Sequence, residues 1–167
     1  TPQRLIEQTG VKHIITTNEV FDDLSTFPAI AEKRYKFTVA PAFRADKMMN
    51  IEAEKYNDFI AILEEKTKKI NTFGDFESAI ADRLDAFIAV GAVASDIAVE
   101  KVCAVPERRV AEQAFEERRQ GKVLTQTQID DFKGYMTYYL MKLYAGRNIR
   151  TELHIGAMRN NNSVMLK

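Results

Sequence analysis

The chain has 167 residues, which is enough for one domain with a buried core. Its 24 lysines and arginines balance 24 aspartates and glutamates, and this zero net charge gives no argument for a nucleic-acid or anionic membrane partner. No apolar run approaches the roughly 20 residues of a membrane span, no signal peptide is visible, and the single Cys103 excludes an internal disulfide. We therefore expect a cytoplasmic protein that binds a small molecule, with neither nucleic acid nor membrane as a partner.

The first part of the chain predicts two strands, each flanked by a helix. Gly10 is a good residue to end the first helix, and Pro41 is expected to stop the second strand. Pro28 falls inside the second helix and should delay its start or kink it. The predicted elements are a helix over 4–8, a strand over 11–17, a helix over 22–33 and a strand over 36–40.

The rest of the chain predicts four longer helices and two further strands. Asp75 could cap the second of these helices, and Ser95 or Asp96 could cap a helix directly after the third strand. Thr125 and Gln128 have the spacing of a capping box. The predicted elements are helices over 52–70, 75–90, 106–119 and 125–145 and strands over 92–94 and 150–155.

Strands that alternate with helices favour an α/β fold with a parallel sheet. Four consecutive parallel βα units would make about half of a (β/α)₈ TIM-type barrel, here with extra helices. We expect residues 1–167 to form a single domain, a partial barrel that is a fragment of a longer enzyme, because the chain lacks an initial Met. An open half barrel bares apolar edges, so a homo-oligomer is also expected.

Polar side chains follow each of the four predicted strands. The carboxyl ends of parallel strands gather at one edge of a sheet, where α/β proteins place their function. Arg44 and Lys47 could hold a carboxylate there, the guanidinium through two parallel hydrogen bonds and the ammonium through its charge. A solvated loop with a local pair between Arg44 and Asp46 is the alternative. The strand ends that should meet are 16–19, 41–47, 95–96 and 154–162.

His154 ends the fourth strand and is one of two histidines in the chain. It could bind a metal, carry a proton or contact hydroxyl groups, or it could be a hydrogen-bonded core residue. Arg159 and Asn160 belong to a run that offers many hydrogen-bond donors, although such a run is also typical of a polar loop. Taken alone, Asp96 is most simply a helix cap and Cys103 a small core residue. These alternatives stay open on pattern alone.

Four blocks of the sequence together resemble the uronate isomerase family. The most specific is Leu-His-Ile-Gly-Ala-Met-Arg-Asn-Asn-Asn, in which the family's strand also ends in His-Ile-Gly-Ala and continues Arg-Asn-Asn-Asn. The block Pro-Ala-Phe-Arg-Ala-Asp-Lys resembles the family's Pro-Ser-Trp-Arg-Pro-Asp-Lys. The four blocks, which fall in the family's order and cover essentially the whole chain, are 11–17, 41–52, 91–96 and 153–162.

This resemblance implies an amidohydrolase-type, metal-dependent barrel that interconverts D-glucuronate with D-fructuronate and D-galacturonate with D-tagaturonate. It implies that a small sugar acid is the partner and that a divalent metal, typically zinc, is the cofactor of the full-length family. On this interpretation Arg44 holds the substrate carboxylate with Lys47 nearby, and His154 lines the site as the catalytic candidate. Arg159 and Asn160 shape its rim.

The sequence also departs from the family pattern. Asn-Glu-Val at 18–20 stands where the family commonly has Asp-Asp-Pro, Phe43 replaces Trp, and Ile97 stands where many members have His. The family's His-x-His metal pair has no counterpart in this sequence. We therefore assign no metal ligand and expect the chain alone to bind no metal and to be inactive.

Two other functions stay open. One is a small self-contained α/β module that binds an anionic ligand through Arg44 and Arg159 without catalysis, and the other is a purely structural fragment. Strand order separates the isomerase fragment from the module. Sequential neighbours with open edges favour the isomerase fragment, and a closed sheet with reordered strands favours the module.

Overall fold

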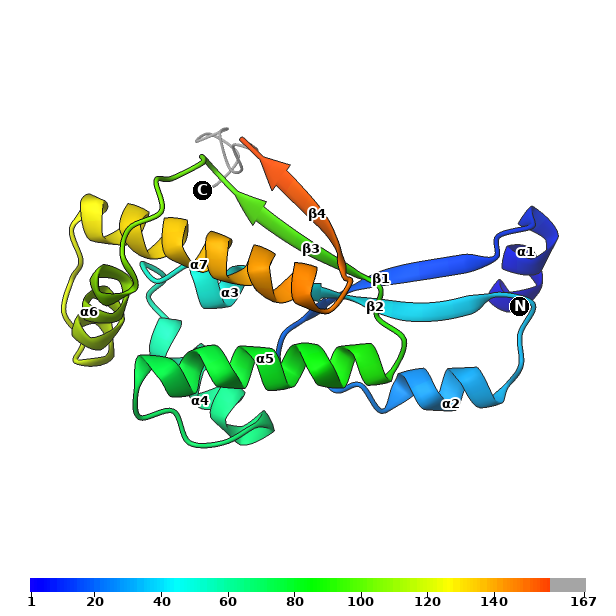
Figure 1. Ribbon diagram of the computed structural model, residues 1–167. Coiled ribbons are helices and arrows are strands. Elements are labelled where there is room, and N and C mark those ends of the chain that lie inside the picture. The colour runs from blue at the N-terminus through cyan, green and yellow to red at the C-terminus, as the bar shows by residue number, and fades with distance from the viewer. Residues whose placement is uncertain (157–167) are drawn as a thin grey trace, which may run out of the picture.

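The computed structural model describes residues 1–156, which form one four-stranded sheet and seven helices (Figure 1). No helix in this part of the chain is both long and apolar enough to cross a membrane. The elements are α1 (Pro2–Thr9), β1 (His13–Glu19), α2 (Thr26–Glu32), β2 (Thr38–Arg44), α3 (Asp46–Met49), α4 (Tyr56–Lys66), α5 (Phe73–Ala89), β3 (Ala94–Val99), α6 (Arg108–Arg119), α7 (Gln126–Gly146) and β4 (Arg150–Ile155).

The strands lie in sequential order, β1-β2-β3-β4, and every neighbouring pair is parallel. This confirms the predicted series of βα units. The pairing is uneven, however. The β1–β2 ladder runs from His13–Thr38 to Glu19–Arg44 and the β3–β4 ladder runs the length of both strands, whereas β2 and β3 are paired only at Phe43–Ser95. The β3–β4 pair therefore diverges from the β1–β2 pair, as Figure 1 shows.

The sequence predicted that the second strand stops at Pro41, and this prediction is wrong. The strand continues to Arg44, with Pro41 opposite Thr16 of β1. Proline is tolerated in a strand where no partner needs its missing N–H. Within residues 1–156, β3 pairs with β2 only at Phe43, so no β3 partner faces Pro41.

The third strand is also longer and later than predicted. It runs from Ala94 to Val99, so Ser95 and Asp96 lie inside it and cap no helix. Alternation explains this assignment, because Ser95 and Ile97 are completely buried while Asp96 lies on the other face.

Two helices begin with a complete capping box. Thr125 and Gln128 form the predicted box at the start of α7. At α5 the cap is Thr72, and Asp75 is its reciprocal partner rather than the cap itself. The helices predicted over 22–33, 52–70 and 106–119 begin later, at Thr26, Tyr56 and Arg108.

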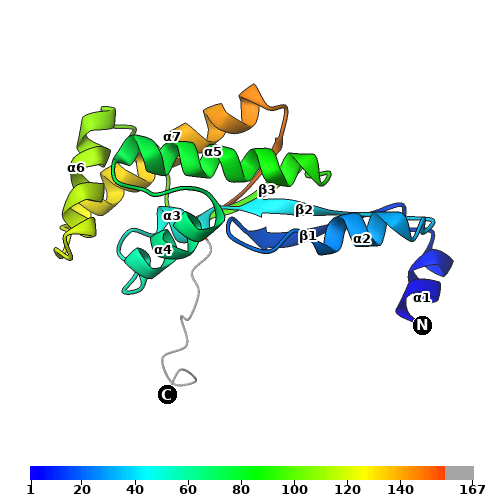
Figure 2. The same ribbon diagram turned by 90° about the horizontal axis from the view of Figure 1, so that it is seen from below.

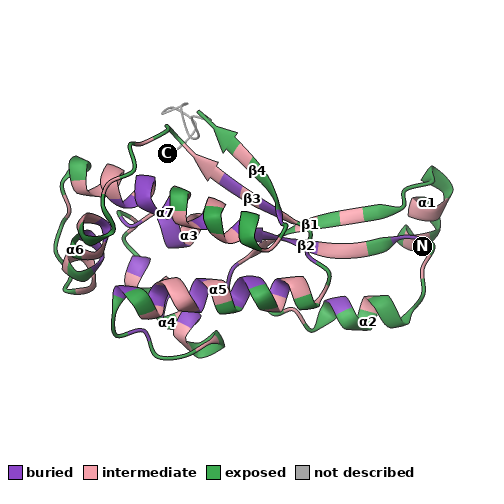
Figure 3. Cartoon of the chain, viewed as in Figure 1, coloured by how far each residue is buried: buried purple, intermediate pink, exposed green. Residues whose placement is uncertain are grey.

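The core lies between one face of the sheet and the long helices α5 and α7, which lie on the same side of the strands (Figure 2). Phe43 of β2 is completely buried, and its ring meets Phe87 of α5 edge-on at 5.0 Å and Tyr144 of α7 at 6.2 Å. The opposite face lacks such a cover in the described part of the chain, and Ile15 of β1 is 50% exposed there. Buried residues thus concentrate where α5 and α7 meet the sheet (Figure 3).

One glycine allows a close approach on this covered side. The segment before α6 passes over α7 at Gly134, where an added Cβ would lie 2.0 Å from the carbonyl oxygen of Ala104. Only glycine lets this backbone pass so close to the helix.

Candidate functional site

The open face of the sheet gathers polar side chains from the carboxyl ends of the strands. Thr17 and Glu19 of β1 share this face with Arg44 of β2, because Glu19 lies opposite Arg44 and side chains alternate along a strand. Thr17 Oγ1 donates a hydrogen bond to Asp96 Oδ2 of β3 at 2.8 Å. Phe43, between Ala42 and Arg44, lies on the opposite, core face. The face opposite α5 and α7 is therefore the polar one.

His154 completes this row from β4. Its Nε2 lies 3.2 Å from Asp96 Oδ1 and 3.4 Å from Glu152 Oε1, and its side chain is half-exposed. The predicted convergence of the first, third and fourth strand ends is thus confirmed by contacts among Thr17, Asp96 and His154. The simpler interpretation of His154 as a core residue is wrong, and so is that of Asp96 as a helix cap.

Arg44 is held by the carboxylate two residues after it. Its Nε donates to Asp46 Oδ2 at 3.0 Å, and both side chains are largely buried, so the local pair exists but not in a solvated loop. Burial lowers the pKa of Arg44, but the hydrogen bond to Asp46 and the charges of Asp46, Asp96 and Glu19 outweigh it and raise the pKa overall. Within residues 1–156 its two terminal Nη groups donate no hydrogen bond. In this part of the chain no hydrogen-bond partner competes with a ligand for these two groups.

Lys47 is held in a different way. Its Nζ lies 3.5 Å from Glu19 Oε1 and over the rings of Phe21 and Phe59, at 5.1 Å and 5.3 Å from their centroids. The two rings are stacked on each other. Lys47 thus has a carboxylate and two aromatic faces around it before any ligand binds.

Glu19 lies in the strand end 16–19 that was expected to meet the others, but the sequence indicated no role of its own for it. Its Oε2 is buried and has no partner within the described residues. Burial raises the pKa of the Glu19 carboxyl, and the neighbouring Lys47 and Arg44 charges oppose this shift. The signal that could have found it is its place at the end of the first strand, in register with Arg44.

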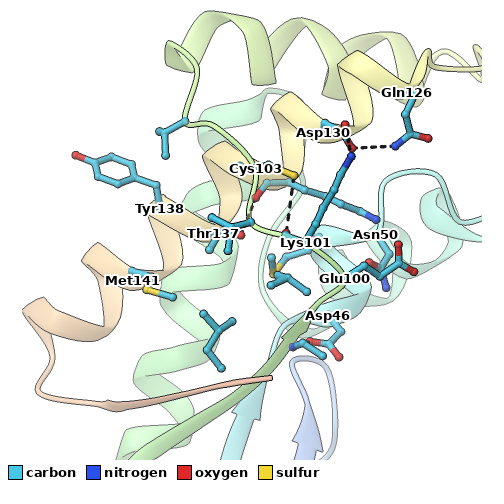
Figure 4. Close-up of a pocket in the computed structure, with 18 residues that line it drawn as sticks. Asp46, Asn50, Glu100, Lys101, Cys103, Gln126, Asp130, Thr137, Tyr138 and Met141 are labelled. Carbon is cyan, nitrogen blue, oxygen red and sulfur yellow. Dashed lines mark hydrogen bonds and ion pairs between the residues drawn. The ribbon is translucent and has the colours of Figure 1, made fainter. Parts of the chain in front are cut away.

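A cavity of about 680 Å³ lies beside this cluster, between the end of β3, α3 and α7 (Figure 4). Its volume is in the range of small-molecule sites. Asp46 forms part of its wall. Lys101 and Asp130 also line it, and their charges cancel in an ion pair with an N–O distance of 2.6 Å. Cys103 also lines the cavity, so it is not a core residue, and burial raises the pKa of its thiol. A protonated thiol is a poor nucleophile. The open-face cluster is therefore the better candidate for chemistry.

A metal centre does not fit the residues that the structure describes. Within 1–156, no group of three or more histidine, cysteine, aspartate or glutamate side chains could hold a metal ion. Arg159 and Asn160, which were predicted to shape the rim, lie outside the described residues.

The family model and the curated relatives agree on one kind of isomerase. The family model for glucuronate isomerase matches residues 1–167. The uronate isomerases of Caldanaerobacter subterraneus subsp. tengcongensis and Mannheimia succiniciproducens are each 36% identical to it, over 99% and 98% of the chain. The same alignments cover 36% of each relative, so the chain spans little more than a third of the curated proteins it matches.

Solved structures agree with this result. The crystal structure of a uronate isomerase from Thermotoga maritima matches with a TM-score of 0.92 and 29% identity, over 99% of this chain and 37% of that one. A glucuronate isomerase from Caulobacter crescentus matches with a TM-score of 0.89 over 99% and 35% of the two chains, and at 23% identity it shows the fold alone. The four parallel strands and the helices that connect them are thus part of a TIM-type barrel. The chain belongs to the glucuronate isomerase family.

Proposed function

We propose that this chain is the part of a cytoplasmic uronate isomerase that binds the substrate carboxylate and contributes to proton transfer. The reaction interconverts aldose and ketose sugar acids, D-glucuronate with D-fructuronate and D-galacturonate with D-tagaturonate. One observation carries the proposal. The Arg44 guanidinium, anchored through Nε, shares an open face of parallel strand ends with the Asp96–His154 pair.

Arg44 is suited to the carboxylate that distinguishes a uronate from a neutral sugar. A guanidinium and a carboxylate form two parallel, charge-assisted hydrogen bonds, and Nη1 and Nη2 supply such donors once Nε is taken. Lys47, already paired with Glu19, adds positive charge nearby. Arg159 and Asn160 remain proposed rim residues.

His154 is suited to moving a proton. Aldose–ketose isomerisation takes a proton from the carbon beside the carbonyl group and returns it to the neighbouring carbon. An imidazole titrates near neutral pH and can perform both steps. The carboxylate of Asp96, 3.2 Å from Nε2, orients the ring.

The cofactor is the second part of the proposal. A divalent metal, with zinc as the first candidate, would polarise sugar oxygens when bound by the full-length enzyme. We propose that its ligands lie outside this chain, which binds none alone, and that the isolated 167 residues do not isomerise uronates. Homo-oligomer formation through the open sheet edges is proposed as well, and sedimentation of the purified chain measures it.

The test is a chimera in which this chain replaces the matching segment of the Thermotoga maritima uronate isomerase. Turnover of D-glucuronate to the ketose is expected. Arg44→Lys should lower kcat/KM by about tenfold or more, because a bidentate contact becomes a single one. Arg147→Lys is the matched control, since Arg147 makes a two-point pair with Asp85 and lies outside the cluster.

Three results would contradict the proposal. A folded chimera that binds D-glucuronate without converting it would favour the non-catalytic anion-binding module. Equal losses from Arg44→Lys and Arg147→Lys would remove Arg44 from the site. Turnover by the isolated chain would show that the assignment of the metal to other segments is wrong.

A further inference from the structure

Strands β2 and β3 have fewer paired residues than the other neighbouring strands, and the carboxylate of Asp46 links the end of β2 to β3. These strands are paired only at Phe43–Ser95. Beyond this pair, Asp46 Oδ1 accepts a hydrogen bond from the backbone N–H of Ala98 in β3 at 3.0 Å. The same carboxylate, through Oδ2, accepts from Arg44 Nε at 3.0 Å. Asp46 therefore connects the guanidinium of Arg44 directly to the neighbouring strand.

We propose that Asp46 is the positioning residue of this site. It fixes the Arg44 guanidinium against β3 so that the two Nη groups are presented to the substrate carboxylate. This inference rests on the proposed function in assigning the ligand, but the structural connection itself does not.

Burial and chemistry support this role. The Asp46 side chain is 14% exposed and that of Arg44 is 23% exposed, so neither hydrogen bond is open to full competition from water. A free arginine side chain must lose considerable rotamer freedom when it binds a ligand. Because Asp46 already holds Nε in the free protein, part of the side-chain entropy of Arg44 is lost on folding and not on substrate binding.

Two donors face Asp46, one at each carboxylate oxygen, and this makes asparagine an informative replacement. Asparagine has nearly the same shape but carries only one acceptor oxygen, and its amide group is a donor. In Asp46→Asn, either Ala98 N–H or Arg44 Nε–H must therefore face another donor. The variant changes the hydrogen bonding without creating a cavity.

The first experiment measures hydrogen exchange by NMR in the 167-residue chain. In Asp46→Asn, the Ala98 amide or the Arg44 Nε–H, whichever loses its acceptor, should exchange roughly tenfold to a hundredfold faster, the range for losing a hydrogen bond to a charged group. Asp85→Asn is the matched control, since it removes the carboxylate partner of Arg147, and should leave Ala98 unchanged. Unchanged exchange at both Ala98 N–H and Arg44 Nε–H in Asp46→Asn would overturn the proposal.

A second hydrogen-exchange measurement uses the unaltered chain, so it also decides the case in which Asp46→Asn does not fold. In the unaltered chain, Arg44 Nε–H should exchange much more slowly than Nε–H of Arg4, which is exposed and donates no hydrogen bond within the described residues. Equal exchange at the two guanidinium groups would contradict the hold of Asp46 on Arg44.

The third experiment separates positioning from general support of the fold. In the active chimera, Asp46→Asn should raise KM for D-glucuronate by about tenfold with a smaller change in kcat. The effect on KM should disappear when Arg44 is already lysine, because Asp46 acts through Arg44. An equal effect in both backgrounds would assign Asp46 a merely structural role. An inactive unmodified chimera would count against the proposed function, and hydrogen exchange would still decide whether Asp46 holds Arg44.

Discussion

Phe43 and Arg44 are neighbours in the sequence but belong to two different regions of the molecule. Phe43 is completely buried on the face covered by α5 and α7. Arg44 lies on the opposite face, where its guanidinium meets carboxylates instead of rings. The covered face is closed and apolar, and the open face is polar and has partners from all four strands. Folding free energy should therefore come mainly from the covered face, while binding depends on the open one.

The largest expected effect on stability is at Phe43. Phe43→Ala should lower the free energy of unfolding by about 3–5 kcal/mol, because it removes a fully buried ring from between α5 and α7. Ile15→Ala, a truncation on the open face, should cost about 1 kcal/mol or less. Urea denaturation followed by circular dichroism measures both. Similar losses at the two positions would break the distinction between the faces.

Gly134 tests the covered side where backbone approaches backbone. Gly134→Ala should cost about 1–3 kcal/mol, because the new Cβ requires the carbonyl of Ala104 to move. Gly146→Ala in the same helix has open space around its Cβ and should be neutral or stabilising by up to about 1 kcal/mol. The same denaturation experiment compares the two. A gain at both positions would show that the segment before α6 moves without cost.

Thr72 should have a smaller effect at the beginning of α5. Its hydroxyl accepts from the backbone N–H of Asp75, so Thr72→Ala should lower the free energy of unfolding by about 1 kcal/mol. Thr72→Ser keeps the acceptor and is the control. Thermal unfolding of the two variants should separate them, and equal stability would show that this cap contributes nothing.

The two regions should respond to pH with opposite sign, which is the smallest predicted effect. Hydrogen bonds from Thr72 lower the pKa of Asp75, so this carboxylate adds stability above its ordinary pKa and loses it as the pH falls. Burial raises the pKa of Glu19, so its ionisation costs stability, a cost that grows as the pH rises from about 4.5 through the raised pKa.

Variants without the titrating groups measure this difference. The deficit of Asp75→Asn relative to the unaltered chain should shrink as the pH is lowered from 6 towards about 3. Glu19→Gln should become progressively more favourable relative to the unaltered chain as the pH rises from about 4 to about 7. Denaturation midpoints across this range give both slopes, and equal signs would contradict the assignment of burial as the cause at Glu19.

Local sequence patterns determined many of the helix ends and the order of helices and strands. The Thr125–Gln128 capping box, the left-handed Gly10 after α1 and the alternation of strands with helices were all predicted correctly, because each depends on residues a few positions apart. Polar strand ends indicated the open face for the same reason. In a parallel sheet, right-handed connections between the strands then bring those ends to the same edge.

The tertiary structure alone decided which residues from distant parts of the sequence contact one another. Pro41 stays in β2 because no β3 partner faces it, and Asp96 lies in a strand because Ser95 and Ile97 enter the core. Asp46 reaches Ala98 across 52 positions and Thr17 reaches Asp96 across 79, separations at which no local pattern specifies a partner. The sequence by itself determined which residues are polar and that four strands alternate with helices. Which carboxylate holds which cation was decided by packing, because burial and the divergence of β2 from β3 set those distances.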